Sequence, residues 1–309
     1  KCRFQKFSDV LAESAHPVDM QGSEIVPESD SGQPLTSFLD HDGFSLIPAA
    51  STSAPLLERI KNGYSFLCVV RKTAEELFIP SDFVPNREDI ESKKMHFFPI
   101  TYPLIMPIGK IIISSLFDFG NATFEDFRSL SIDEKTAVAS GSFKFLVLLD
   151  AAYRSSHYFP DCDTRLAGYL FSETDADLEN FLDTVPSKIN KDEVSSVYRQ
   201  NTTKLLKVKD HFTRVSPSDY EFALLLGLTF WNNEISTVCE SLSPLVERNR
   251  KAIMDDLHSF YKHQARLNYA ARVGELFCLL ANMEEISTLT DTDMELYKLM
   301  NLFTEFGQN

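Results

Sequence analysis

The segment 136–153 is nearly uniformly apolar and contains the run FKFLVLLDAAY, which only Lys144 and Asp150 interrupt. A helix that is hydrophobic all round must be covered on every side, because a surface helix keeps a polar stripe toward water. The segment 222–231, FALLLGLTFW, shows the same pattern. The two segments therefore predict helices with other helices packed against both sides, which is a three-layer helical sandwich.

Apolar residues at helical spacing predict the other helices. The predicted ranges are 54–78 with a break near Gly63, 102–121, 131–155, 174–183, 189–209, 222–231, 235–264, 268–286 and 291–306. Ser131, with Glu134 three residues on, predicts a capping box, and Ser216 before Pro217 predicts the start of the helix through 222–231. A short β-hairpin is expected within 157–172. The predicted fold class is all-α, with about ten to twelve helices and this one hairpin.

Charge and cysteine usage exclude several classes of protein. The net charge of −15 and the isoelectric point near 4.9 disfavour binding of nucleic acid or anionic membrane by bulk charge. The five cysteines, Cys2, Cys68, Cys162, Cys239 and Cys278, form no CxxC pair, so we expect reduced thiols and neither a disulfide framework nor a zinc site. We expect no signal peptide and no membrane span, since the run at 143–153 is too short for one.

The sequence offers no catalytic constellation. His258 and His263 are five residues apart and miss the spacing that places two metal ligands on one helix face. The adjacent pairs Asp133–Glu134 and Glu284–Glu285 point in different directions, which is typical of solvated helix ends rather than of an acid–base pair. Glycine-rich phosphate loops and nucleophile-elbow motifs are also missing from the sequence. We therefore expect no enzyme.

The first fifty residues differ from the rest in composition. Between Lys6 and Arg59 there is no Lys or Arg, and Asp and Glu alternate with Ser, Pro and Gly. Residues 8–50 are expected to form an acidic, disordered hinge, because they cannot bury enough apolar area to offset the entropy of ordering. The stretch 35–47, LTSFLDHDGFSLI, mixes acidic and bulky apolar residues and has two interpretations, a linker or a segment that binds a partner.

Two stretches, FRSLSIDEK at 127–135 and FLVLLDAAYRSS at 145–156, resemble the signature of the nuclear receptor ligand-binding domain. In that family, helix 3 ends in F-x-x-L, an acidic residue with Gln or Lys follows in helix 4, and a buried helix 5 ends in an aromatic residue, Arg and Ser. EFALLLGL at 221–228 is similar to the family's helix 8, and ARVGEL at 271–276 to its helix 10. Among members of the family, these stretches most resemble the supplementary nuclear receptors of nematodes. The matching positions in the first two stretches are Phe127, Leu130, Glu134, Lys135, Tyr153, Arg154 and Ser155.

The resemblance implies a ligand-binding domain over residues 51–309. Residues 1–7, KCRFQKF, also resemble the end of the family's zinc-finger DNA-binding domain, in which Cys2 would be the last zinc ligand. Phe7 stands where the family usually has Cys, and a chance match over so few residues is the other interpretation. We expect no cofactor in this chain. Zinc and DNA binding are expected only in a longer parent with intact fingers.

The family assigns two roles to the last helices. Glu221 and Arg272 match its structural ion pair between helices 8 and 10, and pairing is expected because an unpaired buried charge is costly. Helix 10 is the family's dimer surface, with Tyr269, Val273 and Phe277 at the matching positions. The other interpretation is that this stripe faces its own core. The partner is expected to be a second copy or another nuclear receptor.

The resemblance also implies a pocket for a small lipophilic ligand, such as a fatty acid or a sterol-like lipid, with Arg154 at its polar end. The alternative is a cavity filled by Phe side chains, with Arg154 bonded to backbone carbonyls of 157–172. An open cavity of several hundred Å³ would favour the ligand. The expected lining is Ile108, Ile111, Ile112 and Ser115 from helix 3, Phe143, Leu146 and Leu149 from helix 5, and Phe277 from helix 10.

The last motif, LFTEF, matches the family's activation helix, which clamps a coregulator helix. The Lys that completes the clamp falls on Ala122 here, so the basic half is absent; Lys135, one turn away, is a candidate substitute. The expected function is a nuclear, non-membrane transcription factor domain that regulates RNA polymerase II transcription. The alternative is a ligand-free helical module that dimerises with or titrates other receptors. The expected coregulator site comprises Lys135, Val138, Leu302, Phe303, Glu305 and Phe306.

Overall fold

The computed structural model describes residues 54–77, 101–160, 175–187, 190–266 and 268–289. The chain divides after Leu35 into two units, and every described residue belongs to the second, Thr36–Asn309. The described part contains ten α-helices, one 3₁₀ helix and no strand. The α-helices are α2 (Pro55–Leu77), α4 (Tyr102–Thr123), α5 (Glu125–Ser129), α6 (Ile132–Tyr158), α7 (Asp175–Thr184), α8 (Lys191–Val215), α9 (Asp219–Phe230), α10 (Glu234–Val238), α11 (Ser243–His263) and α12 (Ala270–Leu289), and the 3₁₀ helix is η1 (Glu240–Leu242).

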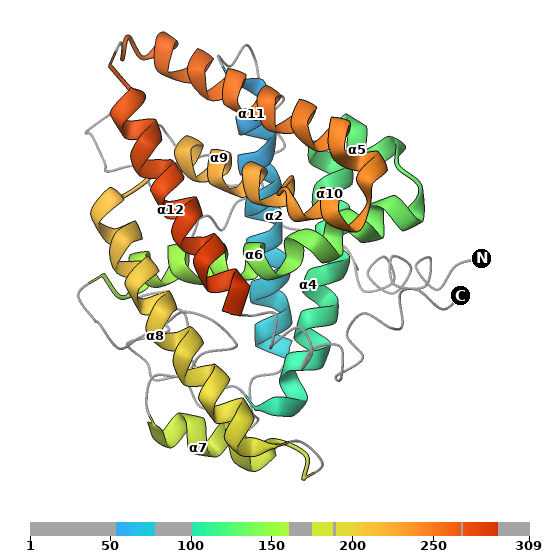
Figure 1. The fold of residues 1–309 in the computed structure, drawn as a ribbon, viewed down its shortest axis with the longest axis vertical. Helices are drawn as coiled ribbons and strands as arrows, with labels where there is room; N and C mark the ends of the chain where they lie inside the picture. The colour runs from blue at the N-terminus through green and yellow to red at the C-terminus, as the bar shows by residue number, and fades with distance from the viewer. Residues whose placement is uncertain (1–53, 78–100, 161–174, 188–189, 267, 290–309) are drawn as a thin grey trace, which may run out of the picture. The chain divides into compact units, whose positions relative to one another are not determined.

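The helices form three layers, as predicted (Figure 1). Helices α6 and α9 are the middle layer and contact each other. On one side α2 packs against α4, α9 and α11; on the other, α8 and α12 pack against each other and against α6. The two segments without a polar face are therefore covered on both sides. The expected hairpin and the expected helix at 291–306 lie largely or wholly outside the described residues.

The middle layer is closely packed because small and aromatic residues face each other. A Cβ on Gly227 of α9 would lie 2.8 Å from Cδ1 of Ile60 in α2 and 3.0 Å from Cδ1 of Ile253 in α11, so only glycine allows the three helices to approach this closely. The ring of Tyr153 stacks on Phe222, with centroids 3.7 Å apart. This contact explains why the apolar helix α6 continues into Tyr153: the ring joins the two middle-layer helices.

The capping box predicted at the start of α6 is confirmed. The Ser131 hydroxyl accepts from the Glu134 N–H, and the Glu134 carboxylate accepts from the Ser131 N–H at 2.9 Å. The predicted cap of α9 is wrong by two residues. Ser218, not Ser216, is the N-cap, and its own capping box uses Glu221. Ser216 instead adopts a left-handed backbone with φ of 45°, which separates α8 from α9.

Two further helix predictions need correction. The range 235–264 is three elements, α10, η1 and α11, because the chain leaves helical geometry at Cys239, where φ is −142° and ψ is 92°. The break expected near Gly63 is absent, and α2 is continuous. Gly63 serves a close approach instead, since a Cβ there would lie 2.7 Å from Cδ2 of Phe119 in α4.

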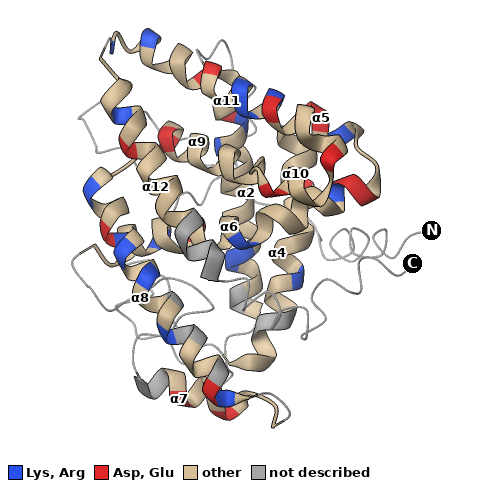
Figure 2. Ribbon diagram, in the orientation of Figure 1, with Lys and Arg blue, Asp and Glu red and all other residues tan. Residues whose placement is uncertain are grey.

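Helix α4 is the one helix of the described part that is long and apolar enough, by length and composition, to cross a membrane. No such segment is predicted by the sequence. Helix α4 packs against α2, α5, α6 and α7, and the core helix of a helical bundle can be as long and as apolar as a membrane span. Acidic and basic side chains are mixed over the described helices (Figure 2).

Candidate functional site

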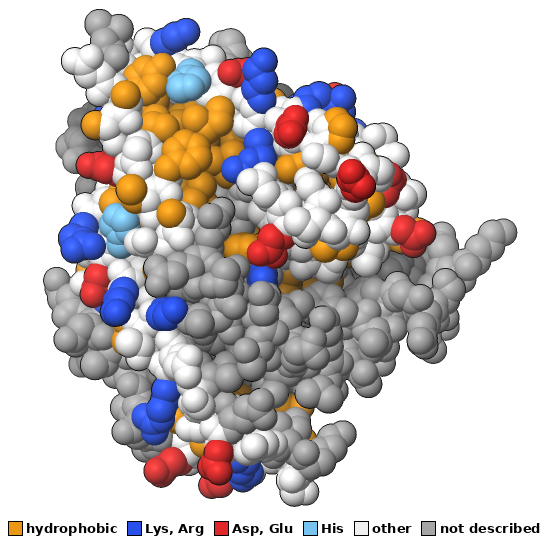
Figure 3. Space-filling model, viewed as in Figure 1, with side chains coloured by type: hydrophobic (Ala, Val, Ile, Leu, Met, Phe, Trp, Pro, Cys, Tyr) orange, Lys and Arg blue, Asp and Glu red, His pale blue; other side chains and the backbone are white. Residues whose placement is uncertain are grey.

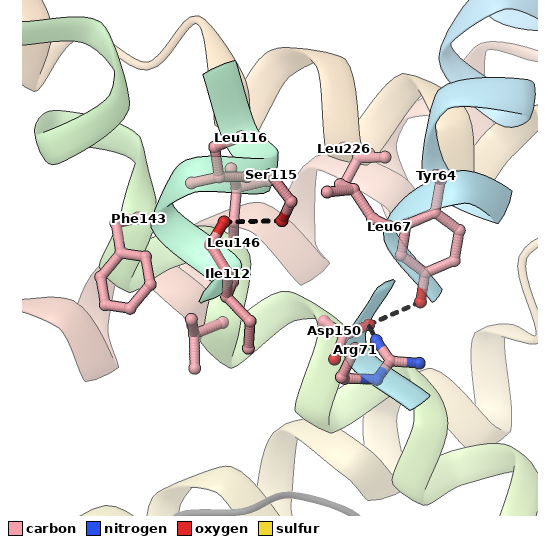
Figure 4. A pocket seen from close by; sticks show the side chains of 11 residues that line it. Tyr64, Leu67, Arg71, Ile112, Ser115, Leu116, Phe143, Leu146, Asp150 and Leu226 are labelled. Carbon is pink, nitrogen blue, oxygen red and sulfur yellow. Dashed lines mark hydrogen bonds and ion pairs between the residues drawn. The ribbon is translucent and has the colours of Figure 1, made fainter. Parts of the chain in front are cut away.

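A small cavity lies among α2, α4, α6 and α9, with a volume of about 40 Å³. It has room for roughly three water molecules, at about 10–15 Å³ each. In Figure 4 Tyr64, Arg71 and Asp150 gather at one end, and Phe143 lies at the other. The cavity is thus apolar with a polar end. Its lining is Tyr64, Leu67, Arg71, Ile112, Ser115, Leu116, Phe143, Leu146, Val147, Asp150 and Leu226.

The polar end is organised by the carboxylate of Asp150 on α6. Its Oδ1 accepts from the Tyr64 hydroxyl at 2.7 Å and from Nη1 of Arg71, both on α2. Its Oδ2 accepts from Nε of Arg154, one turn further along α6, at 2.9 Å. Three donors from two helices therefore hold one carboxylate, and we call Tyr64, Arg71, Asp150 and Arg154 the Asp150 cluster.

Asp150 is ionised in this setting. Burial alone would raise the pKa of Asp150, but the charges of Arg154 and Arg71 and the hydrogen bond from Tyr64 outweigh it and lower the pKa. Burial, reinforced by the charge of Asp150, raises the pKa of Tyr64 well above its usual range. Tyr64 therefore stays a neutral donor. Burial also raises the pKa of the nearby Cys68 thiol.

Arg154, expected at the polar end of a ligand, is 2% exposed and is not among the residues that line the cavity. It donates instead to Asp150, which does line the cavity. Of the other residues expected to line a pocket, Ile112, Ser115, Phe143 and Leu146 do so. Ile108 and Leu149 are buried elsewhere in the core, Ile111 is partly buried away from the cavity, and Phe277 is 39% exposed on α12.

A second buried carboxylate, Glu221 at the start of α9, lies at the junction of α8, α9 and α12. Arg272 donates from Nε to its Oε1 at 2.8 Å and from Nη2 to its Oε2 at 2.9 Å, and the Tyr261 hydroxyl donates to Oε1 at 2.6 Å. Arg272 also donates to the carbonyls of Val215 and Ser216. The residues predicted to pair therefore contact each other in a two-pronged geometry.

This arrangement keeps Glu221 ionised as well. Burial opposes ionisation, but the hydrogen bonds from Arg272, Tyr261 and the Ser218 backbone lower the pKa of Glu221 to about 2. Burial and the bond to Glu221 raise the pKa of Tyr261. The set Glu221, Tyr261 and Arg272, which we call the Glu221 cluster, ties the end of α8 and the start of α9 to α12.

The three residues expected at a dimer surface are placed differently from one another. Tyr269 stacks on Tyr261 with centroids 4.8 Å apart, and Val273 is partly buried against the core. Phe277 is exposed, together with Ala270, Gly274, Cys278 and Ala281 on the same helix. These five residues form an uncharged face, which we call the α12 face. Figure 3 shows hydrophobic side chains gathered where α11 and α12 lie over α9.

Part of the expected coregulator site is described. Lys135 is partly buried with its Nζ 5.6 Å from the Phe127 ring centroid, and Val138 is fully buried. Ala122, at the position of the missing cation, is exposed near the end of α4. Leu302, Phe303, Glu305 and Phe306 lie outside the described residues.

Sequence reasoning missed four members of these clusters, Tyr64, Arg71, Asp150 and Tyr261. Tyr64 and Arg71 are 86 and 79 residues from Asp150, and no local pattern connects them. The signal that existed was a single acid, Asp150, inside an apolar helix, since a buried charge requires partners. Among the described residues, no group of three His, Cys, Asp or Glu side chains comes together as a metal site.

Comparison with known proteins agrees with this architecture. Residues 92–300 match the model of the ligand-binding domain of nuclear hormone receptors. The chain therefore belongs to the nuclear hormone receptor ligand-binding domain family.

Two similar proteins come from Caenorhabditis elegans. Nuclear hormone receptor family member nhr-16 is 21% identical over 267 residues, which cover 84% of this chain and 65% of that protein. Nuclear hormone receptor family member nhr-213 is 28% identical over 112 residues, 36% of this chain and 27% of that protein. The resemblance to nematode receptors is thus confirmed. The chain spans less than two thirds of the length of either relative.

Proposed function

We propose that this chain is the regulatory domain of a nuclear receptor transcription factor. Its main function in this proposal is to bind other proteins, and it dimerises through the α12 face. The observation that carries the proposal is the exposure of Phe277 on a face without charge. A large aromatic side chain beside Ala270, Gly274 and Ala281 leaves apolar area in water that a second copy would cover. Glycine at 274, with no neighbouring atom within 4 Å of a Cβ placed there, leaves room for a partner.

Sedimentation velocity tests this proposal. Phe277→Glu places a charge in the centre of the face and is expected to weaken self-association at least about tenfold, roughly 1.4 kcal/mol. Val69→Glu is the matched control, because Val69 is also apolar and helical and is 49% exposed on α2. A wild-type chain that stays monomeric at high concentration, or equal weakening by both variants, would contradict dimerisation through this face.

The second candidate function is ligand binding, and the polar end of the cavity favours it. Arg71, Asp150 and Tyr64 border an otherwise apolar lining, which is the usual composition of small-molecule pockets. The volume of about 40 Å³ among the described residues supports the ligand-free alternative instead. Native mass spectrometry after gentle purification separates the two: a co-purified lipid supports the ligand, and a bare chain that also ignores a lipid panel removes it.

Coregulator binding is a further part of the proposal. Alanine at 122 supplies no cation for the end of a coregulator helix, whose carbonyls favour one, and the nearby Glu125 and Asp126 are acidic and lie against Arg59 and Arg248. An LxxLL-type helix is therefore expected to bind weakly or in a shifted register, and Ala122→Lys to strengthen binding by about 1 kcal/mol. Fluorescence anisotropy with a labelled peptide checks this. Micromolar binding that is lost in Glu305→Ala and indifferent to Ala122→Lys would show that the missing cation is unimportant.

The wider role follows from the family. We propose nuclear localisation and regulation of RNA polymerase II transcription, with DNA bound by zinc fingers of a longer parent. A nuclear stain of the tagged full-length protein and a reporter assay with this domain fused to a heterologous DNA-binding domain are the direct tests. A fusion that leaves the reporter unchanged in both directions would argue for a module that only titrates other receptors.

A further inference from the structure

Helix α8 concentrates positive charge on a chain that is strongly acidic as a whole. The net charge of the chain is −15, whereas residues 199–214 of α8 contain five Lys or Arg and a single acid, Asp210. In Figure 2 Lys and Arg follow one another along α8, whereas α11 mixes the two signs. Lys209 is buried, and the other four basic residues are exposed or partly exposed. We call these four the α8 stripe: Arg199, Lys204, Lys207 and Arg214.

The members of the α8 stripe share one side of the helix. At about 100° per residue, positions 199, 207 and 214 fall within about 80° of one another around the helix axis, and 204 lies about 60° beyond them. Lys207 and Arg214 are exposed, and neither side chain has a hydrogen bond or ion pair among the described residues. Like charges three or four residues apart on a helix repel each other. An anion at the stripe would relieve this repulsion.

His211 lies between Lys207 and Arg214 on the same side of α8 and is neutral. The amide of Asn282 on α12 donates to Nδ1 of His211 at 2.8 Å, which requires a ring nitrogen without a proton. Burial and the charge of Arg214 lower the pKa of His211, against the opposing effect of Glu275. The positive charge of the α8 stripe therefore comes from Lys and Arg alone at neutral pH.

We propose that the α8 stripe binds a short acidic segment of a partner protein. At about 1.5 Å per residue the stripe is about 22 Å long, which is the length of roughly seven residues of extended peptide. At an ionic strength of about 0.1 M, charges more than about 10 Å apart are largely screened from each other. Carboxylates on the stripe are therefore attracted by it and are little affected by acidic residues elsewhere on the chain. This surface is separate from the α12 face, and the inference does not depend on dimerisation.

A nucleic acid, although also anionic, fits the stripe less well. A DNA duplex is a stiff rod with one charge per about 1.7 Å, and it would extend past both ends of the stripe. Beyond those ends it would meet a chain whose net charge is −15. A flexible peptide can end where the stripe ends, and its carboxylates pair with both Lys and Arg. An acidic peptide is therefore the class of ligand that the charge distribution favours.

Fluorescence anisotropy of the full chain with labelled octaglutamate tests the proposal, with octaglutamine as the neutral counterpart. At about 0.1 M salt octaglutamate is expected to bind at least about fivefold more tightly, since each exposed ion pair adds little and several act together. Lys207→Glu combined with Arg214→Glu is expected to abolish this preference. The matched control is Lys251→Glu combined with Lys262→Glu, which changes two exposed lysines of α11 and is expected to keep it. Both double variants change the net charge by the same amount.

Four results would overturn the assignment. Equal binding of the two peptides would exclude selection of an acidic segment, and equal losses in the α8 and α11 variants would make net charge the cause. Tighter binding of a labelled DNA duplex than of octaglutamate would make the stripe a nucleic-acid surface. Salt-sensitive self-association that the α8 variant abolishes, measured by sedimentation velocity, would assign the stripe to a second copy.

A milder pair of variants covers loss of folding. Should the α8 double variant fail to fold, as judged by circular dichroism, Lys207→Gln combined with Arg214→Gln takes its place. It is expected to reduce the preference for octaglutamate at least about twofold, while Lys251→Gln combined with Lys262→Gln leaves it unchanged. A preference that survives the α8 glutamine variant would also exclude the stripe as the binding surface.

Discussion

The Asp150 cluster and the Glu221 cluster use the same three side-chain types for different ends. Each holds a buried carboxylate with a tyrosine hydroxyl and with arginine, and each joins helices far apart in the sequence. At Glu221 one arginine serves the carboxylate and also takes two backbone carbonyls, and the described cavity lies elsewhere. At Asp150 two arginines share one carboxylate, and one of them borders the cavity.

The two clusters differ in what their arginines contact besides the buried carboxylate. Arg272 donates to the carbonyls of Val215 and Ser216 in the connection between α8 and α9. Its guanidinium therefore supplies the hydrogen bonds that these backbone groups need. Arg71 makes its bond to Asp150 from the edge of an apolar hollow.

Removing the carboxylate of the Asp150 cluster is expected to have the largest effect. Asp150→Ala leaves Arg71 and Arg154, both nearly fully buried, without the charge that holds them together. The free energy of unfolding is expected to fall by about 4 kcal/mol, within the range for breaking a buried pair. Urea denaturation followed by circular dichroism measures it. A loss as small as that of an exposed pair would mean that the two arginines are held by other contacts.

Removing the cation of the Glu221 cluster is expected to cost somewhat less. Arg272→Ala is predicted to lower the free energy of unfolding by about 3 kcal/mol, since Glu221 stays buried while Arg272 itself is 24% exposed. Arg59→Ala is the control, because its contact with Glu125 is 3.8 Å long and exposed and is worth at most about 1 kcal/mol. An unchanged melting curve for Arg272→Ala would remove the pairing as a source of stability.

The acid side of the pH–stability curve distinguishes the two carboxylates. The folded pKa of Glu221 is about 2, below its ordinary value of 4.5, so its contribution is present above pH 4.5 and is lost as the pH falls toward 2. Glu221→Gln is expected to flatten the curve in this window, because an amide does not titrate. Its cost in stability is expected to be smaller than that of Arg272→Ala, because the amide still occupies the place of the carboxylate. Asp150→Asn is the comparison variant, since the pKa of Asp150 is also lowered. Identical slopes for wild type and Glu221→Gln would contradict the assignment.

The tyrosine hydroxyls are expected to matter least and about equally. Tyr64→Phe and Tyr261→Phe each remove one hydrogen bond to a charged carboxylate that keeps its arginine partners, at a cost of about 1.5–2 kcal/mol. Thermal melts of the two variants, with Tyr269→Phe as a tyrosine outside both clusters, measure this. A much larger loss for Tyr64→Phe would show that Tyr64 also fixes the shape of the cavity.

The sequence predicted the layers better than it predicted the site. The all-apolar segments of α6 and α9 require cover on both sides whatever surrounds them, and the box of Ser131 and Glu134 is a local pattern that long-range packing leaves intact. The cap of α9 was misplaced because Ser216 and Ser218 both precede a helical run. The break at Cys239 was missed because the apolar spacing continues across it.

The site depends on contacts that no local pattern encodes. Glu221 and Arg272 were paired through the family motif and the cost of an unpaired buried charge, and they lie 51 residues apart. Arg154 was expected to face a ligand because its position in the motif says nothing of Asp150, one turn earlier on the same helix. The partner of that carboxylate on α2, Arg71, is 79 residues away, so only the folded chain brings it there.

Helix α6 runs without interruption from the capping box at Ser131 past Asp150 to Tyr158, 27 residues in all. At a rise of about 1.5 Å per residue it is a rod roughly 40 Å long. The one helix therefore connects the buried carboxylate of Asp150 in the interior with the surface of the molecule at Ile132, which is 68% exposed.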